Sequence, residues 1–131
     1  MAILNIKQIL SADDLESQTM TIPEWGGEVI IRTMTEADRS KIEASVIQQN
    51  GSNQSVNMER YKVKIVVASL VDEEGKRLFT QKNIDALRQK SARPINRIVN
   101  AAQKLNGISD DDVEELMGNS NETEDGDSVS D

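Results

Sequence analysis

The side chains that could do chemistry in this sequence are carboxylates, lysines, arginines and hydroxyls, because histidine and cysteine are both absent. Their absence removes the Ser-His-Asp and Cys-His nucleophile arrangements, thiolate metal sites and the group that ordinarily titrates near neutral pH. It also rules out disulfides, which suits an intracellular protein. We therefore expect a non-enzymatic protein and assign no catalytic residue.

Two acidic runs superficially resemble calcium loops, Asp72-Glu73-Glu74-Gly75 and 110–112. Such a loop needs alternating ligands, with glycine at the sixth position and glutamate at the twelfth. Counted from Asp72, glycine is fourth and Asn83 is twelfth, and the second run fails the same pattern. The phosphate-loop, dinucleotide, H-E-x-x-H and C-x-x-C motifs are absent as well. The expectation is no metal and no cofactor, with the acidic pairs interpreted as solvated charge.

The net charge of -8 is concentrated at the end of the chain. Residues 109–131 hold ten acidic residues and neither lysine nor arginine, whereas residues 1–108 carry fifteen basic and thirteen acidic groups. The last stretch, GNSNETEDGDSVSD, has too few apolar residues to offset its ordering entropy, so we expect a disordered acidic tail over 118–131. We favour a solubilising role for it. The alternative is a tail that screens a basic surface, since lysine and arginine concentrate between Arg60 and Lys104.

The same composition narrows the class of partner. Only three aromatic residues occur, and the body is nearly neutral, so base stacking and a strong phosphate-binding face are not supported. The opening MAILNIKQILSADD has acids directly after its apolar run, unlike a secretory signal, and no stretch reaches membrane-spanning length. We expect an intracellular, soluble protein that binds neither nucleic acid nor membrane.

The chain length fits one domain with a modest core, which we place at residues 1–117. Residues 18–34 are typical of a β-hairpin, with polar and apolar residues alternating up to Ile22 and a β-branched run from Val29. Between them, Pro-Glu-Trp-Gly-Gly at 23–27 supplies a reversing turn. A lone hairpin is marginal in water, so we expect it to pack on helices with Trp25 as an apolar lid.

Helical periodicity dominates the rest, which predicts an α+β, mostly helical fold with about four to five helices. Ile3–Leu10 fits either a short helix or an extended arm, and Ser11–Asp14 resembles the cap of another turn. Further helices are predicted at 36–49 and 58–71, with a surface loop over 50–55. A short helix capped by Thr80 follows, then one opened by Ser91 and stopped at Asn106-Gly107. The last helix is predicted to be capped by Ser109 and Asp112 and to end at Gly118.

The order of these parts resembles the tail assembly chaperone family of long-tailed bacteriophages. The resemblance covers about residues 11–117 and rests on three stretches in the same order: IPEWGGEVIIRTMTEADRSKIE, ASLVDEEGKRLFTQKNIDAL and KSARPINRIVNAAQKLNGISDDDVEEL. The succession of the three stretches, rather than any one of them, carries the resemblance. The tail after Gly118 matches no pattern of the family.

The resemblance implies a non-enzymatic role in virion morphogenesis. Proteins of this family bind the tape measure protein, keep it soluble and help recruit tail tube proteins, in the cytoplasm of an infected or lysogenic host and not in the mature virion. It leaves open a longer frameshifted form and a homo-oligomer. The competing hypothesis is a small acidic adaptor or inhibitor module that docks on a basic protein through its tail.

Exposed aromatics and arginines carry a large share of interface energy, so our candidate partner contacts are Trp25, Arg32, Tyr61 and Phe79. The same side chains suit the core of a domain with so few rings, and we favour that interpretation.

Overall fold

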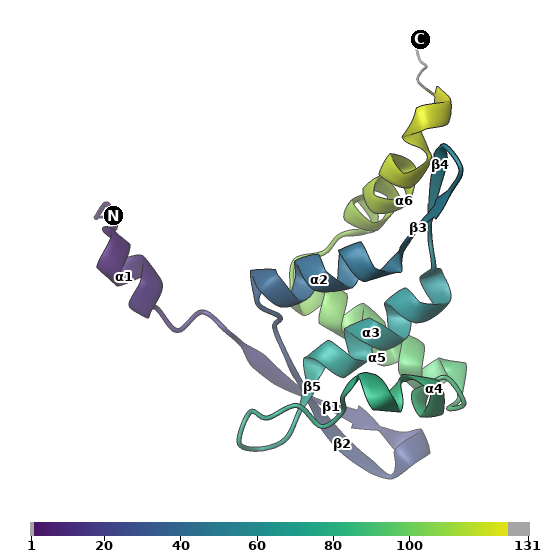
Figure 1. Ribbon diagram of the computed structural model, residues 1–131. Helices are drawn as coiled ribbons and strands as arrows, with labels where there is room; N and C mark the ends of the chain where they lie inside the picture. Colours follow the sequence, from purple (N-terminus) through teal and green to yellow (C-terminus); the bar gives the residue numbers. More distant parts are fainter. Residues whose placement is uncertain (1, 126–131) are drawn as a thin grey trace.

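The computed structural model describes residues 2–125, and for Gln49, Asn50, Asn53 and 118–125 it describes the backbone alone. The α+β, mostly helical class is confirmed. Six α-helices occur in the described residues, accompanied by a three-stranded and a two-stranded antiparallel sheet. Figure 1 shows the helices gathered above the larger sheet, with helix α1 (Ile6–Ser11) standing apart from this body.

The larger sheet begins with strands β1 (Ser17–Ile22) and β2 (Gly27–Arg32), which pair antiparallel from Ser17↔Arg32 to Ile22↔Gly27. The short 3-10 turn η1 (Pro23–Trp25) joins them. The third strand of this sheet, β5 (Leu70–Val71), comes later in the chain and pairs antiparallel with β2. The prediction that one helix runs over 58–71 is wrong in its last two residues, because α3 (Met58–Ser69) ends where Leu70 and Val71 pair with β2.

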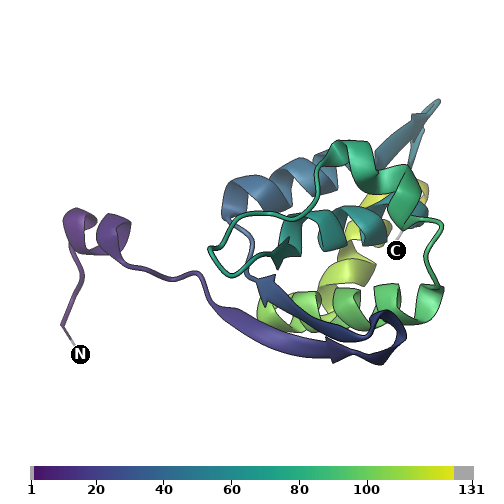
Figure 2. The ribbon, with the colours of Figure 1, turned by 90° about the horizontal axis from the view of Figure 1, so that it is seen from below.

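Helix α3 is the centre of the body. It contacts α2 (Glu36–Val46), α4 (Ile84–Leu87) and α5 (Ala92–Leu105), and α5 also contacts β2. Figure 2 shows α5 beside the β1–β2 hairpin and α3 on the side of α2. One core cluster runs through these elements, and its most deeply buried side chains include Ile22, Ile31, Tyr61, Ile65, Val66, Leu70, Ile98 and Ala102.

The polar segment after α2 is a second hairpin. The prediction of a helix up to 49 and a loop over 50–55 is wrong: β3 (Ile47–Asn50) pairs with β4 (Asn53–Val56). Two residues make the turn, and the first, Gly51, has φ of +67°, as in two-residue turns that suit the twist of paired strands. Asn57 N donates to Val46 O at 2.8 Å and closes the base of this hairpin.

Capping residues begin and end several helices where the sequence predicts. Thr35 Oγ1 accepts from Asp38 N, Thr80 caps η2 (Gln81–Asn83) ahead of α4, and Ser91 caps α5. Gly107, with φ of +71°, follows the end of α5. At the other end of the chain, Asn5 and Gln8 form a capping box for α1, whereas no helix begins at Ser11–Asp14 as predicted, because Ser11 is already the last residue of α1.

Helix α6 (Asp110–Asp125) begins at the predicted Ser109–Asp112 box. Ser109 N donates to Asp112 Oδ2, and Asp112 N donates to Ser109 Oγ. It packs on β4. The prediction that this helix ends at Gly118 is wrong, since a single interior glycine costs only about 1 kcal/mol and does not force an end. Residues 118–125, predicted to be disordered, are therefore helical, while 126–131 lie outside the described residues.

Candidate functional site

The strongest candidate site is an apolar groove between the η1 turn and α4. The groove has a volume of about 530 Å³, within the range of about 300–1,000 Å³ typical of binding sites. Its lining residues are Glu24, Trp25, Phe79, Asn83, Ala86, Leu87 and Lys90. Trp25 and Phe79 are half-buried and pack on the core, so each keeps part of its ring toward the groove.

The η1 wall is held in place by an ion pair to α5. Arg97 donates to both carboxylate oxygens of Glu24, at 2.8 and 2.9 Å, which is the bidentate geometry that gives such pairs directional strength. These hydrogen bonds lower the pKa of Glu24 to about 2 and raise the pKa of Arg97. The ring of Trp25 follows Glu24 directly in the chain, so the pair fixes the position of the turn that carries it.

The α4 wall is set by its cap and its buried face. Thr80 Oγ1 accepts from Lys82 N and Asn83 Oδ1 accepts from Thr80 N, which fixes the chain just after Phe79. Ile84 and Leu87 are 4% and 6% exposed and anchor α4 on the core. Ala86 and Lys90, by contrast, are exposed, so they form the open rim of the groove.

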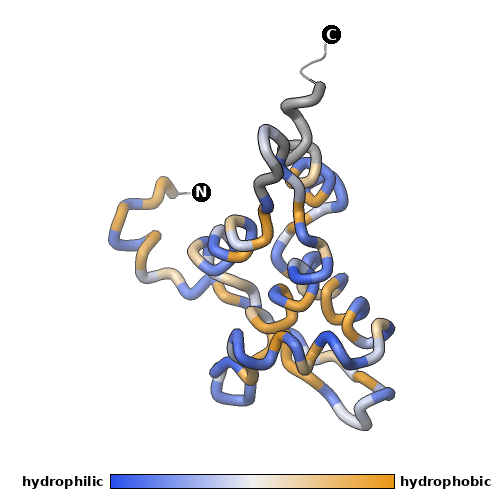
Figure 3. The backbone as a smooth tube through the Cα atoms, turned by 45° about the vertical axis from the view of Figure 1, so that its right-hand side comes forward, coloured by the Kyte–Doolittle hydropathy of each residue, from blue (hydrophilic) through white to orange (hydrophobic). Residues whose placement is uncertain are grey.

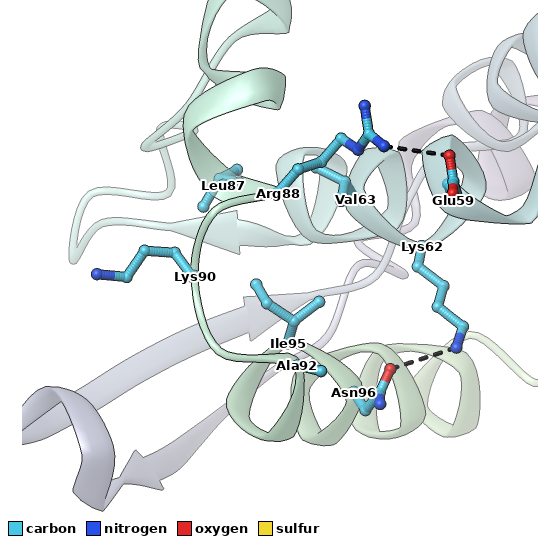
Figure 4. Close-up of a pocket in the computed structure, with 9 residues that line it drawn as sticks. All are labelled: Glu59, Lys62, Val63, Leu87, Arg88, Lys90, Ala92, Ile95 and Asn96. Carbon is cyan, nitrogen blue, oxygen red and sulfur yellow. Dashed lines mark hydrogen bonds and ion pairs between the residues drawn. The ribbon is translucent and has the colours of Figure 1, made fainter.

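A second hollow of about 290 Å³ is lined by residues of α3, α4, α5 and the connection between α4 and α5. Leu87 and Lys90 line both depressions. Figure 4 shows Arg88 pointing to Glu59 and Lys62 pointing to Asn96 across this hollow, with contacts of 3.1 and 3.4 Å. Its rim is mainly cationic, because the charged lining residues are the three cations Lys62, Arg88 and Lys90 and one acid, Glu59.

The structure brings together two of the four candidate contacts. Trp25 and Phe79 face the same groove. Tyr61 is only 2% exposed, and burial raises the pKa of its hydroxyl, so it belongs to the core. Arg32 is partly buried and donates to Gly75 O at 3.1 Å, which places it in a structural contact away from the groove.

Two features of the molecular surface were not predicted from the sequence. Ala86, Leu87 and Lys90 join the site only because α4 lies beside the η1 turn, and no local pattern signals that proximity. The second feature is the exposure of the apolar run near the start of the chain. Ile3, Leu4, Ile6, Ile9 and Leu10 are exposed, and Figure 3 shows orange, hydrophobic stretches along this detached segment.

The described residues contain neither a cluster of three or more acidic, histidine or cysteine side chains able to hold a metal ion nor a helix long and apolar enough to cross a membrane. The groove itself has apolar walls, formed by Trp25, Phe79 and Leu87, and its charged lining residues are Glu24 and Lys90.

Comparison with known proteins gives the family of the chain. A family model described as phage tail assembly chaperone matches residues 5–119. The chain belongs to the phage tail assembly chaperone family, whose role is non-catalytic. It is similar in fold to the structure of the bacteriophage HK97 tail assembly chaperone, with a TM-score of 0.56, 19% identity, and coverage of 76% of this chain and 95% of that one. No curated protein matches the chain.

Proposed function

We propose that this protein binds the tape measure protein of its phage, keeps it soluble and helps recruit tail tube subunits during tail assembly. The observation that carries the proposal is the apolar groove walled by Trp25 and Phe79 in a member of the chaperone family. The role is exercised in the cytoplasm of the host cell, and the protein is absent from the mature virion.

The groove suits one kind of polypeptide segment. An amphipathic helix lays its apolar stripe into a hydrophobic groove and is held by anchors spaced three or four residues apart. Trp25, Phe79 and Leu87 supply apolar contacts for such a stripe, and Lys90 lies at the edge shared with the cationic hollow. The preferred client segment is therefore a helix with an apolar stripe and an acidic flank.

The binding experiment uses a variant that fills the groove without disturbing the core. Ala86 is exposed on the rim, so Ala86→Arg is expected to change the free energy of unfolding by no more than about 0.5 kcal/mol. It should weaken binding of purified tape measure fragments at least tenfold. Gln89→Arg is the matched control, because Gln89 is also exposed and does not line the groove. Equal binding by both variants would contradict the proposed surface.

The acidic end of the chain supports the second candidate, an adaptor that docks on a basic partner. Deleting 119–131 separates the two, since it removes acids while leaving the groove intact. We expect the truncated protein to retain its affinity for the tape measure protein, whereas loss of that binding would favour the adaptor.

A further inference from the structure

The three-stranded sheet has one edge that its own chain covers and one that it leaves open. On the covered side, Val71 of β5 is bridged to Arg77, and Leu78 N donates to Leu70 O at 3.1 Å. On the other side β1 is the last strand, and within residues 2–125 no strand pairs with its outer edge. Figure 2 shows β1 along the outer side of the hairpin. An open strand edge offers unpaired backbone groups to another strand.

The outward backbone groups of β1 belong to Ser17, Thr19 and Thr21. Thr33 N donates to Glu16 O at 2.9 Å, so the backbone of Glu16 is turned toward β2. In an antiparallel ladder, such residues alternate with residues whose N–H and C=O point the other way. The register with β2 is continuous along the whole strand, so the alternation holds throughout. The three outward residues are also exposed, so another strand can reach all of them.

The sequence of β1 carries none of the features that usually block edge pairing. Natural edge strands are protected by lysine, proline, an inward-pointing charge or a bulge. Strand β1 reads SQTMTI, with neither a charge nor a proline, and it pairs with β2 without a bulge. Helix α5 makes its contacts with the sheet mainly at β2, so it lies under β2 rather than across the edge of β1.

We propose that β1 pairs antiparallel with β1 of a second copy of this chain, about a two-fold axis at Thr19, so that the two sheets become one. In this register Thr19 lies opposite Thr19 of the second copy, and Ser17 lies opposite Thr21. All the outward groups are then paired, in about six backbone hydrogen bonds. Any shift of register leaves one of the three residues without a partner. The hydroxyl side chains face one another on the solvent side, and cross-strand threonine pairs are favourable.

The charges beside β1 favour a second copy over an unrelated strand. A groove of about 570 Å³ between β1 and α5 is lined by three charged residues, namely Glu16, Arg97 and Lys104. Arg97 binds Glu24 at the turn end of the hairpin, whereas Glu16 precedes β1 at the opposite end. A two-fold axis at Thr19 places the Glu16 end of each copy beside the Arg97 end of the other. An acid therefore meets a base twice, as a self-complementary interface requires.

The pairing is independent of the client. Strand β1 contains none of the residues that line the Trp25–Phe79 groove. The pair is therefore tested without client, and its failure would leave the proposed function untouched.

The first test is the mass in solution, by light scattering of the full chain over a series of concentrations. We expect the mass to rise from the 14.5 kDa of one chain toward twice that value. Thr19→Lys should raise the dissociation constant at least about tenfold, because two lysines would face each other across the axis. Thr19→Glu should do the same. An equal mixture of the two variants should associate as tightly as the natural chain, because lysine then faces glutamate.

Gln89→Lys and Gln89→Glu are the matched controls, since Gln89 is exposed and lies outside β1. Their dissociation constants should stay within about twofold of the natural value, because surface substitutions away from an interface change little. A monomer at every concentration would overturn the proposal. So would a mixture of the Thr19 variants that associates no better than either variant alone.

The second test reads the register by cross-linking, because the natural chain has no cysteine. Ser17→Cys mixed with Thr21→Cys should form a disulfide-linked pair under mild oxidation, since directly opposite residues have Cα atoms about 5.5 Å apart. Thr21→Cys alone is the matched control, because its two copies lie four residues out of register, about 14 Å apart. Equal yields from the mixture and the control would overturn the register.

Discussion

Replacing Gly75 by alanine tests whether Arg32 is a structural residue rather than a partner contact. Gly75 has φ of +85°, and an added Cβ would lie 2.9 Å from Arg32 Nη1, the atom that donates to Gly75 O. The left-handed backbone alone costs about 1–2 kcal/mol for alanine. Moving the guanidinium away from its acceptor adds about 1 kcal/mol, reduced from the full value of a charged hydrogen bond because Arg32 is only partly buried.

We therefore expect Gly75→Ala to lower the free energy of unfolding by about 2–3 kcal/mol in the natural chain. In an Arg32→Met background, only the backbone cost of about 1–2 kcal/mol remains. The coupling of about 1 kcal/mol is measured by a double-mutant cycle with urea unfolding followed by circular dichroism.

Gly107→Ala is the matched control for this cycle. Gly107 has φ of +71° and no atom within 4 Å of an added Cβ, so its cost should be the same in both backgrounds. Zero coupling between Gly75 and Arg32 would refute the structural role. So would a loss of tape measure binding by Arg32→Met in a protein that remains folded.

Two further predictions concern contacts that hold distant elements together. The Glu24 pKa is lowered from 4.5 to about 2, so its contribution to stability is present above pH 4.5 and is lost as the pH falls toward 2. Glu24→Gln should flatten the dependence of the urea midpoint on pH in that window, and an unchanged slope would contradict the ion pair. Asn106 Oδ1 accepts from the buried Met34 N at 2.7 Å, so Asn106→Ala should cost about 1–3 kcal/mol in thermal or urea unfolding. A Tm within error of the natural chain would contradict that assignment.

The elements that could be predicted are those whose signals are local. Helix α5 has apolar residues at helical spacing, a serine cap before it and Gly107 after it, and each of these acts within a few residues. The Ser109–Asp112 box likewise sets the start of α6. Such signals fix where a helix begins better than where it ends, as the continuation of α6 past Gly118 shows.

The elements that could not be predicted depend on partners distant in the sequence. The sequence predicts Leu70 and Val71 as the end of a helix, because the strand with which they pair, β2, lies about 40 residues earlier in the chain. The β3–β4 hairpin was not predicted because its residues have the composition of a loop. Strand formation depends less on composition than on packing against the neighbouring strand. The groove could not be predicted either, since most of the residues that line it with Trp25 and Phe79 come from η2, α4 and the turn after α4.

The central claim is that this chain covers apolar surface of the tape measure protein, and the most direct measurement is the soluble fraction of that protein on coexpression. We predict that the natural chain and Gln89→Arg keep the tape measure protein in the soluble fraction, whereas Ala86→Arg leaves most of it in the pellet. A tape measure protein that is equally soluble without this chain would contradict the account.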